Sequence, residues 1–200
     1  MKRLYFIIQA VIALCLVSCK EQNLESIYSS QEERIDSFIK NLIEKNQTPP
    51  APENPDGESG QEGQQQPEIT VVNNSGSNRV TLVPGDGIEL QEGGTVSFYY
   101  AGYVFNGSIS GNNLFATNHE ETATAEKWDV TSPDFSLMTV KLGKDDNLVK
   151  GLHNGLLGVK AGEECYILFS GKYGFGNKNI GMIPVNSAIA YKIWVENVTE

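Results

Sequence analysis

The chain has 200 residues, of which 40% are hydrophobic and 20% are charged, and its formal net charge is -10. This composition is typical of a soluble globular protein and excludes a fibrous or multi-spanning membrane protein. The acidic balance argues against nucleic acid as a partner, because contacts to the phosphate backbone need clustered Lys and Arg. The length allows one domain of ordinary size with extensions.

The first eighteen residues have the pattern of a secretory signal peptide. Lys2 and Arg3 precede an apolar run, Leu4 to Val17, that is short for a membrane span. The run ends in LVSC at Cys19, which resembles the bacterial lipobox and implies cleavage before Cys19 and its lipidation. An uncleaved anchor or a plain signal peptide is the alternative. Because Lys20 stands where Asp would retain a lipoprotein at the inner membrane, the pattern favours a bacterial outer membrane, with either face open.

A lipidated N-terminus and an amphipathic helix are predicted over residues 19–46. Within 24–43, apolar residues recur at three- and four-residue steps with charged residues between them. This helix could pack on the domain, pair with a second copy or form a stalk near the membrane. Packing or self-association is favoured over insertion, because anionic headgroups would repel its acidic face.

Residues 47–68 are rich in Pro, Gly, Gln and Glu and offer almost nothing to bury, which predicts a disordered linker. The folded domain then covers 69–200. Strands are predicted at 80–83, 96–103, 136–142, 165–169 and 189–198, separated by Gly-rich turns. Residues 116–137 are predicted to form a long loop or a small added element. Many short strands with one short helix indicate an α+β fold.

The richest segment is 148–176, which reads LVKGLHNGLLGVKAGEECYILFSGKYGFG. Its apolar residues predict a helix of about two turns, too short to be stable without a sheet to hold it. Gly162 marks a tight turn, a strand follows at 165–169, and a loop with two aromatic residues and three glycines ends the segment. Lys144-Asp145-Asp146, just upstream, is predicted to be a solvated turn.

At these positions the chain resembles the FKBP-type peptidyl-prolyl cis-trans isomerases. The matching residues are Leu148-Val149-Lys150-Gly151-Leu152, Gly155-Leu156, Val159, Gly162-Glu163, Phe175-Gly176 and Ile183-Pro184-Val185-Asn186-Ser187, with the flanking strands Thr95 to Gly102 and Ala188 to Val195. Their order and spacing carry the resemblance, which covers about residues 80–200. It implies a curved antiparallel β-sheet wrapped around one short α-helix, in a lipoprotein form of the family.

The resemblance also implies a proline-binding pocket. Catalytic positions would be Tyr100, Phe115, Val149, Leu152 and Phe175, and further substrate-binding positions would be Met138 or the nearby Phe135, Leu148, Met182, Ile183 and Tyr191. The backbone N–H of Val149 is the expected donor to a substrate carbonyl. Such isomerisation needs an apolar cavity and one or two hydrogen-bond donors, without a cofactor or a metal.

Three positions depart from the family pattern. Ala116 replaces an Asp that orients ligand and neighbouring groups, and Phe175 replaces a Tyr whose hydroxyl donates to the ligand. Leu152 replaces the commonest floor residue, Trp, as in many family members. These changes keep the apolar cavity and remove polar groups around it.

Other interpretations stay open for the same residues. Aromatic residues of a small β-rich domain often simply pack its core. His119 and His153 lie in different elements without the spacing of metal ligands, and Cys165 lies in an apolar strand, which predicts a buried, inert thiol. The leading hypothesis is a membrane-anchored prolyl isomerase that acts on proline-containing secreted or envelope proteins. A catalytically weak binding or chaperone module, or a scaffold of an envelope assembly, is the alternative.

Overall fold

The computed structural model describes residues 2–47, 67–128 and 133–200, with side chains described from Gln22 onward. The helices are α1 (Lys2–Gln47), α2 (Glu120–Ala125) and α3 (Lys150–Leu156), and the two 3-10 turns are η1 (Gly111–Asn113) and η2 (Gly171–Tyr173). The strands are β1 (Thr70–Asn74), β2 (Ser77–Val83), β3 (Thr95–Val104), β4 (Leu114–Thr117), β5 (Met138–Lys141), β6 (Glu164–Phe169) and β7 (Ile189–Thr199). The predicted α+β class is confirmed.

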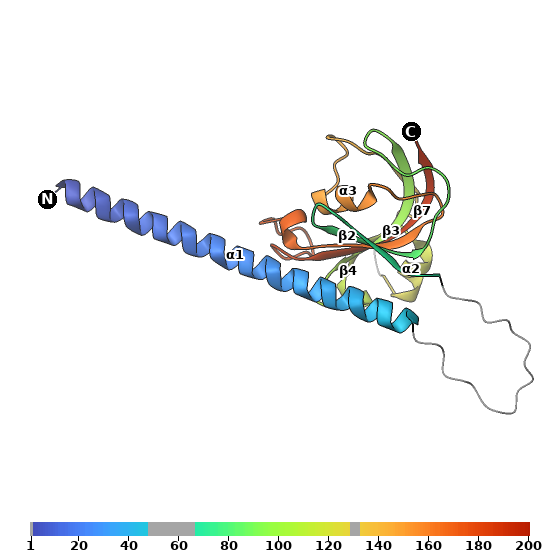
Figure 1. Cartoon of the computed structure of the whole chain (residues 1–200), viewed down its shortest axis with the longest axis horizontal. Helices are drawn as coiled ribbons and strands as arrows, with labels where there is room; N and C mark the ends of the chain where they lie inside the picture. Colours follow the sequence, from blue (N-terminus) through green and yellow to red (C-terminus); the bar gives the residue numbers. More distant parts are fainter. Residues whose placement is uncertain (1, 48–66, 129–132) are drawn as a thin grey trace, which may run out of the picture.

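Within these ranges the strands form one antiparallel sheet in the order β1-β2-β6-β7-β3-β4, with β5 also paired to β3. The sheet curves around α3, while α1 runs beneath the other face (Figure 1). Strand β1, which was not predicted from the sequence, pairs with β2 through a tight turn at Ser75 and Gly76, both with positive φ. Residues 116–137 include the end of β4 and the added helix α2.

Helix α3 packs closely on the sheet because two of its residues lack side chains. A Cβ atom at Gly151 would overlap the ring of Phe169, and one at Gly155 would overlap Ile167. The two glycines are four residues apart and therefore share a face of the helix. Leu152 and Leu156 are buried in the same core cluster. The close approach lets a helix of only seven residues cover the middle of the sheet.

Helix α1 covers the opposite face through Ile35 and Ile39, which are buried with residues of β2, β6 and β7. The ring of Phe38 lies edge-on to Phe105 and Tyr166, with ring centroids 5.4 and 6.1 Å apart. Of the alternatives left open for this helix, packing on the domain is the one that the structure shows. The helix also continues to Lys2, beyond the predicted amphipathic segment.

The predicted linker has little structural counterpart. Apart from its first and last residues, the predicted linker 47–68 lies outside the described residues; Gln47 ends α1, and Pro67 and Glu68 precede β1. Within the part of the chain that the structure describes, no helix has both the length and the apolar character needed to cross a membrane.

Candidate active site

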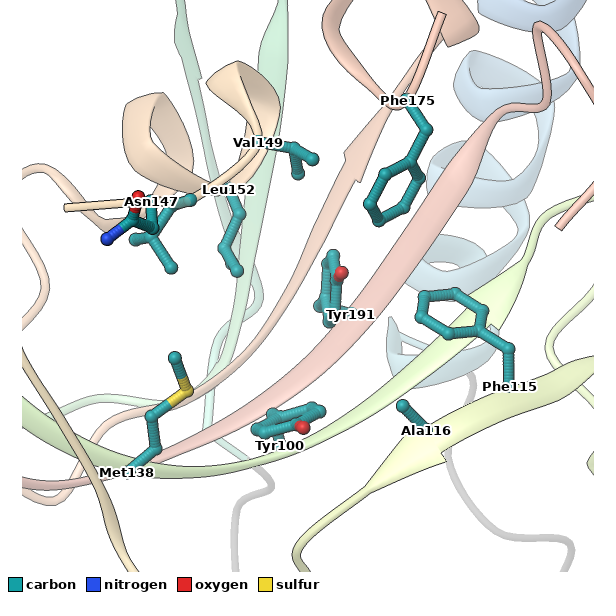
Figure 2. A pocket seen from close by; sticks show the side chains of 10 residues that line it. Tyr100, Phe115, Ala116, Met138, Asn147, Val149, Leu152, Phe175 and Tyr191 are labelled. Atoms are coloured by element: carbon teal, nitrogen blue, oxygen red, sulfur yellow. The ribbon is translucent and has the colours of Figure 1, made fainter. Parts of the chain in front are cut away.

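A cavity of about 160 Å³ opens between α3 and the concave face of the sheet. Strands β3, β4, β5 and β7 supply one side, and the chain around the start of α3 supplies the other. Its lining residues are Tyr100, Phe115, Ala116, Met138, Asn147, Leu148, Val149, Leu152, Phe175 and Tyr191. Figure 2 shows these side chains converging on one space from elements far apart in the sequence.

The walls of the cavity are mainly aromatic. The ring of Phe115 lies edge-on to Phe175 and Tyr191, with centroids 6.3 and 5.8 Å apart, and Tyr191 lies edge-on to Tyr100 at 6.1 Å. Edge-to-face contacts of this kind stabilise aromatic groups beyond the area that they bury. Gly102 makes the arrangement possible, since a Cβ atom there would lie 2.7 Å from Phe115 and 2.8 Å from Tyr191.

The backbone N–H of Val149 is free to bind a ligand. Val149 precedes α3 with extended backbone angles, and its carbonyl accepts hydrogen bonds from the N–H groups of Leu152 and His153 at 2.9 and 3.1 Å. Among the described residues, no group accepts a hydrogen bond from the N–H of Val149 itself. A partly buried donor without a partner on a cavity wall is suited to binding a carbonyl oxygen.

Asp146 holds the loop in front of Val149. Its carboxylate accepts hydrogen bonds from the N–H groups of Gly143 and Leu148, at 3.3 and 2.9 Å, and contacts Nδ1 of His153 at 2.5 Å. The Asp146 side chain is only 5% exposed, so the prediction that Lys144-Asp145-Asp146 is a solvated turn is wrong at Asp146. Asp146 and His153 are seven residues apart in the chain, and their side chains meet only once α3 has formed.

These contacts also set the ionisation of Asp146. Burial raises the pKa of its carboxyl, but the hydrogen bonds from His153, Leu148 and Gly143 lower it by more, so the pKa lies below its usual value. The other ring nitrogen of His153 lies 3.3 Å from the carboxylate of Glu92. The cluster therefore connects the loop before α3 to α3 itself and to the turn before β3.

Phe175 is carried by a loop that runs from Gly171 to Asn186. Within the loop, Gly174 donates to the carbonyl of Gly171 and Lys178 to the carbonyl of Phe175, both at 3.3 Å. Ile180 and Ile183 bond to each other through both backbone groups, and Asn186 donates from its N–H to the carbonyl of Gly176 at 2.7 Å. Asn186 has a positive φ of 57°, a conformation that Asn tolerates better than most residues. Bringing Asn186 back beside Gly176 turns Phe175 towards the cavity.

The structure brings eight of the ten predicted site residues together on the cavity wall: Tyr100, Phe115, Met138, Leu148, Val149, Leu152, Phe175 and Tyr191. It does not place Met182 there, because that side chain is 63% exposed on the outer part of the loop. Ile183 is buried in the core rather than in the cavity lining. Of the two alternatives at β5, Met138 lines the cavity and Phe135 does not.

Two groups at the site were not predicted. Asn147 lines the cavity with a positive φ of 59°, and the sequence signal for it was an Asn at the end of a polar turn. Asn118 is buried behind the cavity, where it accepts from the N–H of Tyr100 at 2.6 Å and donates to the carbonyl of Ser136 at 2.9 Å. Asn118 thus holds β3 against the segment that carries Met138.

The polar side chains that line the cavity are those of Tyr100, Tyr191 and Asn147. Ala116 presents a methyl group and Phe175 has no hydroxyl, while Tyr100 and Tyr191 each bring one. Neither tyrosine hydroxyl forms a hydrogen bond with another described residue. Burial raises the pKa of both tyrosines, with a smaller contribution from Asp134 at Tyr100 and from Tyr100 at Tyr191. Both hydroxyls therefore stay protonated at neutral pH and can donate to a ligand.

Cys165 and His119 lie outside the lining of this cavity. Cys165 is fully buried in β6, and burial raises the pKa of its thiol well above the usual value, so the prediction of an unreactive thiol is confirmed. His119 caps α2 by accepting from the N–H of Thr122, and its ring stacks on Trp194 with centroids 3.8 Å apart. Burial lowers the pKa of His119, which favours the neutral ring.

The chain thus combines a curved antiparallel sheet, a short helix and an aromatic cavity between them. Comparisons with known proteins identify the class of protein that has this architecture. The model of the FKBP-type peptidyl-prolyl cis-trans isomerases matches residues 87–196, and the chain belongs to this family. The chain is 23% identical to FK506-binding protein 1 of Aspergillus oryzae over 118 residues, which cover 59% of this chain and 94% of that protein.

Solved structures agree on the fold. FkpA from Escherichia coli superposes with a TM-score of 0.51 at 14% identity, covering 96% of this chain and 71% of that one. The structure of the three FKBP domains of wheat FKBP73 gives a TM-score of 0.50 at 17% identity, covering 66% of this chain and 50% of that one. The predicted FKBP-like fold is therefore confirmed, and the chain carries a peptidyl-prolyl isomerase domain of this type.

Proposed function

We propose that this protein is a lipid-anchored peptidyl-prolyl isomerase that assists the folding of proline-containing proteins in a bacterial cell envelope. The observation that carries the enzymatic part is the aromatic cavity beside the free N–H of Val149. FKBP domains bind proline-containing peptides, and a cavity of about 160 Å³ with apolar walls suits a proline ring.

The chemistry needs no covalent step. Rotation about a peptide bond crosses a barrier of about 18–20 kcal/mol, because the planar amide is stabilised by resonance. At the transition state the bond is twisted and less dipolar, so an apolar cavity favours it relative to the solvated ground state. We assign Phe115, Phe175 and Tyr191 to enclosing the proline ring, Leu152 to the floor and the N–H of Val149 to a substrate carbonyl.

A substitution by proline tests the donor directly. Val149 has φ -67° and ψ 145°, values that proline can adopt, and its N–H forms no internal hydrogen bond that proline would remove. In a protease-coupled assay on a proline peptide, Val149→Pro should lower kcat/KM by about tenfold, since one hydrogen bond to a carbonyl is lost. The melting temperature should change little.

Two results would contradict the proposal. One is a wild-type domain that, at micromolar concentration, gives no acceleration over uncatalysed exchange. The other is a folded Val149→Pro variant as active as the wild type, which would remove the assigned donor role. Lys141→Ala on the exposed side of β5 is a suitable control, because Lys141 lies outside the cavity lining and should leave kcat/KM unchanged.

The anchor part of the proposal is supported by the sequence of the N-terminus. A basic start, a short apolar run and LVSC at Cys19 are the pattern that directs lipidation, and more than one acyl chain is needed to hold a protein stably on a bilayer. Cys19→Ala should move the protein from the membrane fraction to the soluble fraction of cells. Unchanged membrane retention of this variant would refute the anchor.

A binding or chaperone module is the second candidate. It is favoured because Ala116 and Phe175 bring no polar side-chain group to the cavity. This function predicts that a proline peptide binds the domain, as measured by calorimetry, without acceleration of isomerisation. A scaffold of an envelope assembly would instead be recognised by specific recovery of partner proteins. The isomerase assay and calorimetry on the same sample separate the first two functions.

A further inference from the structure

Helix α1 contacts both ends of the loop that carries Phe175. The side-chain amide of Gln31 accepts a hydrogen bond from the N–H of Gly171, at 2.8 Å, and donates to the carbonyl of Asn186, at 2.7 Å. Gln31 is only 7% exposed, although glutamine side chains are mostly exposed in folded proteins. One buried side chain on α1 therefore joins the first and last residues of the Phe175 loop.

A short chain of hydrogen bonds leads from Gln31 to the cavity. Gln31 binds the carbonyl of Asn186, and the N–H of Asn186 donates to the carbonyl of Gly176, the residue that follows Phe175. At the other end, Gly171 packs so closely on the backbone of Asn186 that any side chain there would overlap it. The position of Phe175 thus depends on how the two ends of its loop are held together.

Neighbouring residues of α1 strengthen the same contact. The hydroxyl of Tyr28 donates to the side-chain oxygen of Asn186 at 3.0 Å, and the carboxylate of Glu32 accepts from the hydroxyl of Ser170 at 3.1 Å. Glu25 lies 3.7 Å from Lys172 as an exposed ion pair. At the tip of the loop, Ile183 is buried in the core, whereas Ile180 and Met182 are 43% and 63% exposed.

We propose that Gln31 is a positioning residue of the active site, through which the docked helix α1 sets the place of Phe175 at the rim of the cavity. This inference rests on the proposed isomerase function and extends it to a helix outside the isomerase domain proper. The physical reason is that the bond from Asn186 to Gly176, the residue after Phe175, lies at the end of the loop that Gln31 holds, and the other end of the loop bonds to the same side chain. The segment that leads to the anchor is in this way coupled to substrate binding.

The main test removes both hydrogen bonds without changing the size of the side chain. Gln31→Met should raise KM for a proline peptide by about fivefold and leave kcat within about twofold. The reason is that Phe175 at the rim helps to bind the substrate, whereas Leu152 at the floor and the N–H of Val149 are unchanged. Gln22→Met, at an exposed position on the same helix, is the matched control and should change neither constant. The full chain without its first eighteen residues is the protein to use.

Gln31→Glu gives a second measurement that a purely structural role would not affect. A protonated carboxyl can donate to Asn186 and accept from Gly171 as the amide does, whereas a carboxylate has no proton to donate. The Gln31 position is only 7% exposed, and burial disfavours the charged form of a carboxyl. Glu32, which accepts from Ser170, is a further carboxylate at this contact. Tyr28, Glu25 and Lys172 are the other titratable groups at this contact. KM of this variant should approach the wild-type value at low pH and rise with pH, unlike that of the wild type.

Amide hydrogen exchange makes the inference testable apart from activity. The Asn186 amide, which donates to Gly176, should exchange about tenfold faster in Gln31→Met than in the wild type, and no faster in Gln22→Met. Unchanged exchange, or faster exchange with an unchanged KM in an active enzyme, would overturn the positioning role. If the wild type shows no isomerase activity, the proposed function fails, and KM is replaced by the dissociation constant of a proline peptide in the same comparison.

Discussion

The two faces of the sheet are covered in different ways. Along β6 and β7, Ile167, Phe169 and Tyr191 point to the concave face under α3, while the residues between them, such as Leu168 and Ala190, point to α1. This alternation follows from the two-residue period of a strand. The α3 face is the larger core but remains open at the cavity, whereas the α1 face combines apolar packing with hydrogen bonds to its helix.

The difference separates stability from ligand binding. At the α1 contact, buried polar groups such as the amide of Gln31 have partners on both sides. At the cavity, the N–H of Val149 and the hydroxyls of Tyr100 and Tyr191 have none among the described residues. Polar groups left without partners beside an apolar cavity can be satisfied by a ligand. Four substitutions test this contrast.

The largest effect is expected on the α1 face. Ile35 is completely buried between the helix and the sheet, so Ile35→Ala should lower the free energy of unfolding by about 2–4 kcal/mol. Ile27→Ala on the same helix is the control, since Ile27 is 39% exposed and should cost about 0.5 kcal/mol or less. Chemical denaturation measures both. Equal values for the two variants would mean that α1 does not dock in solution.

The next effect concerns the close approach of α3. Gly151→Ala should destabilise the domain by about 1–3 kcal/mol, because the new Cβ overlaps the ring of Phe169 and forces the helix away from the sheet. The shift would also move Val149, so kcat/KM should fall. Gly143→Ala is the matched control, as nothing lies within 4 Å of the corresponding Cβ. A Gly151→Ala variant as stable as this control would show that the helix can move without cost.

Asp146 should give a pH-dependent effect. At neutral pH, Asp146→Asn should cost about 1–3 kcal/mol, because it removes charge-assisted hydrogen bonds to the loop and to His153. The folded pKa lies below the usual 3.8, so this stabilisation is fully present above pH 3.8 and is lost as the pH falls through the lower folded value. Glu92 is the other carboxylate at His153.

Denaturation of Asp146→Asn and wild type at pH 7 and at pH 2 measures that dependence, and the difference between them should shrink at the lower pH. The exposed neighbour provides a control: Asp145→Asn should show no such trend. A difference that is constant with pH would mean that the ionised carboxylate is not what stabilises the loop.

The smallest effect is expected inside the cavity. Tyr191→Phe removes a hydroxyl that has no partner among the described residues, so the free energy of unfolding should change by about 0.5 kcal/mol or less. If the hydroxyl donates to bound substrate, KM for a proline peptide should rise by about threefold. Titration of the peptide measures the change in affinity. A lower KM in this variant would indicate that the hydroxyl opposes binding.

Much of the fold could be predicted because its signals are local. The strands at 96–103, 165–169 and 189–198 were predicted within one or two residues of their observed bounds, since β-branched and aromatic residues there are bounded by turns. The hairpin of β1 and β2 was missed at its first strand. Four of the five residues of β1 are exposed and polar residues end it, so it carries no hydrophobic alternation.

The site was predicted less evenly. Eight residues of the cavity were named from the resemblance, because their spacing within short motifs was preserved. Ile183 was named as part of a matching motif and Met182 stands directly before it, but the path of the loop buries Ile183 and exposes Met182. The role of Asp146 could not be read from its polar neighbours, since it depends on a contact with His153 one element away.

By itself, the sequence determined the α+β class, the short helix with its glycine spacing, the absence of polar side chains at 116 and 175, and the N-terminal pattern ending at Cys19. These are properties of residues close together in the chain. Only the tertiary structure decided which donors in the cavity have no partner and which face of the sheet α1 covers. It alone joined Gln31 to the Phe175 loop, 140 residues away at Gly171, because hydrogen bonds of this kind exist only after packing brings distant segments together.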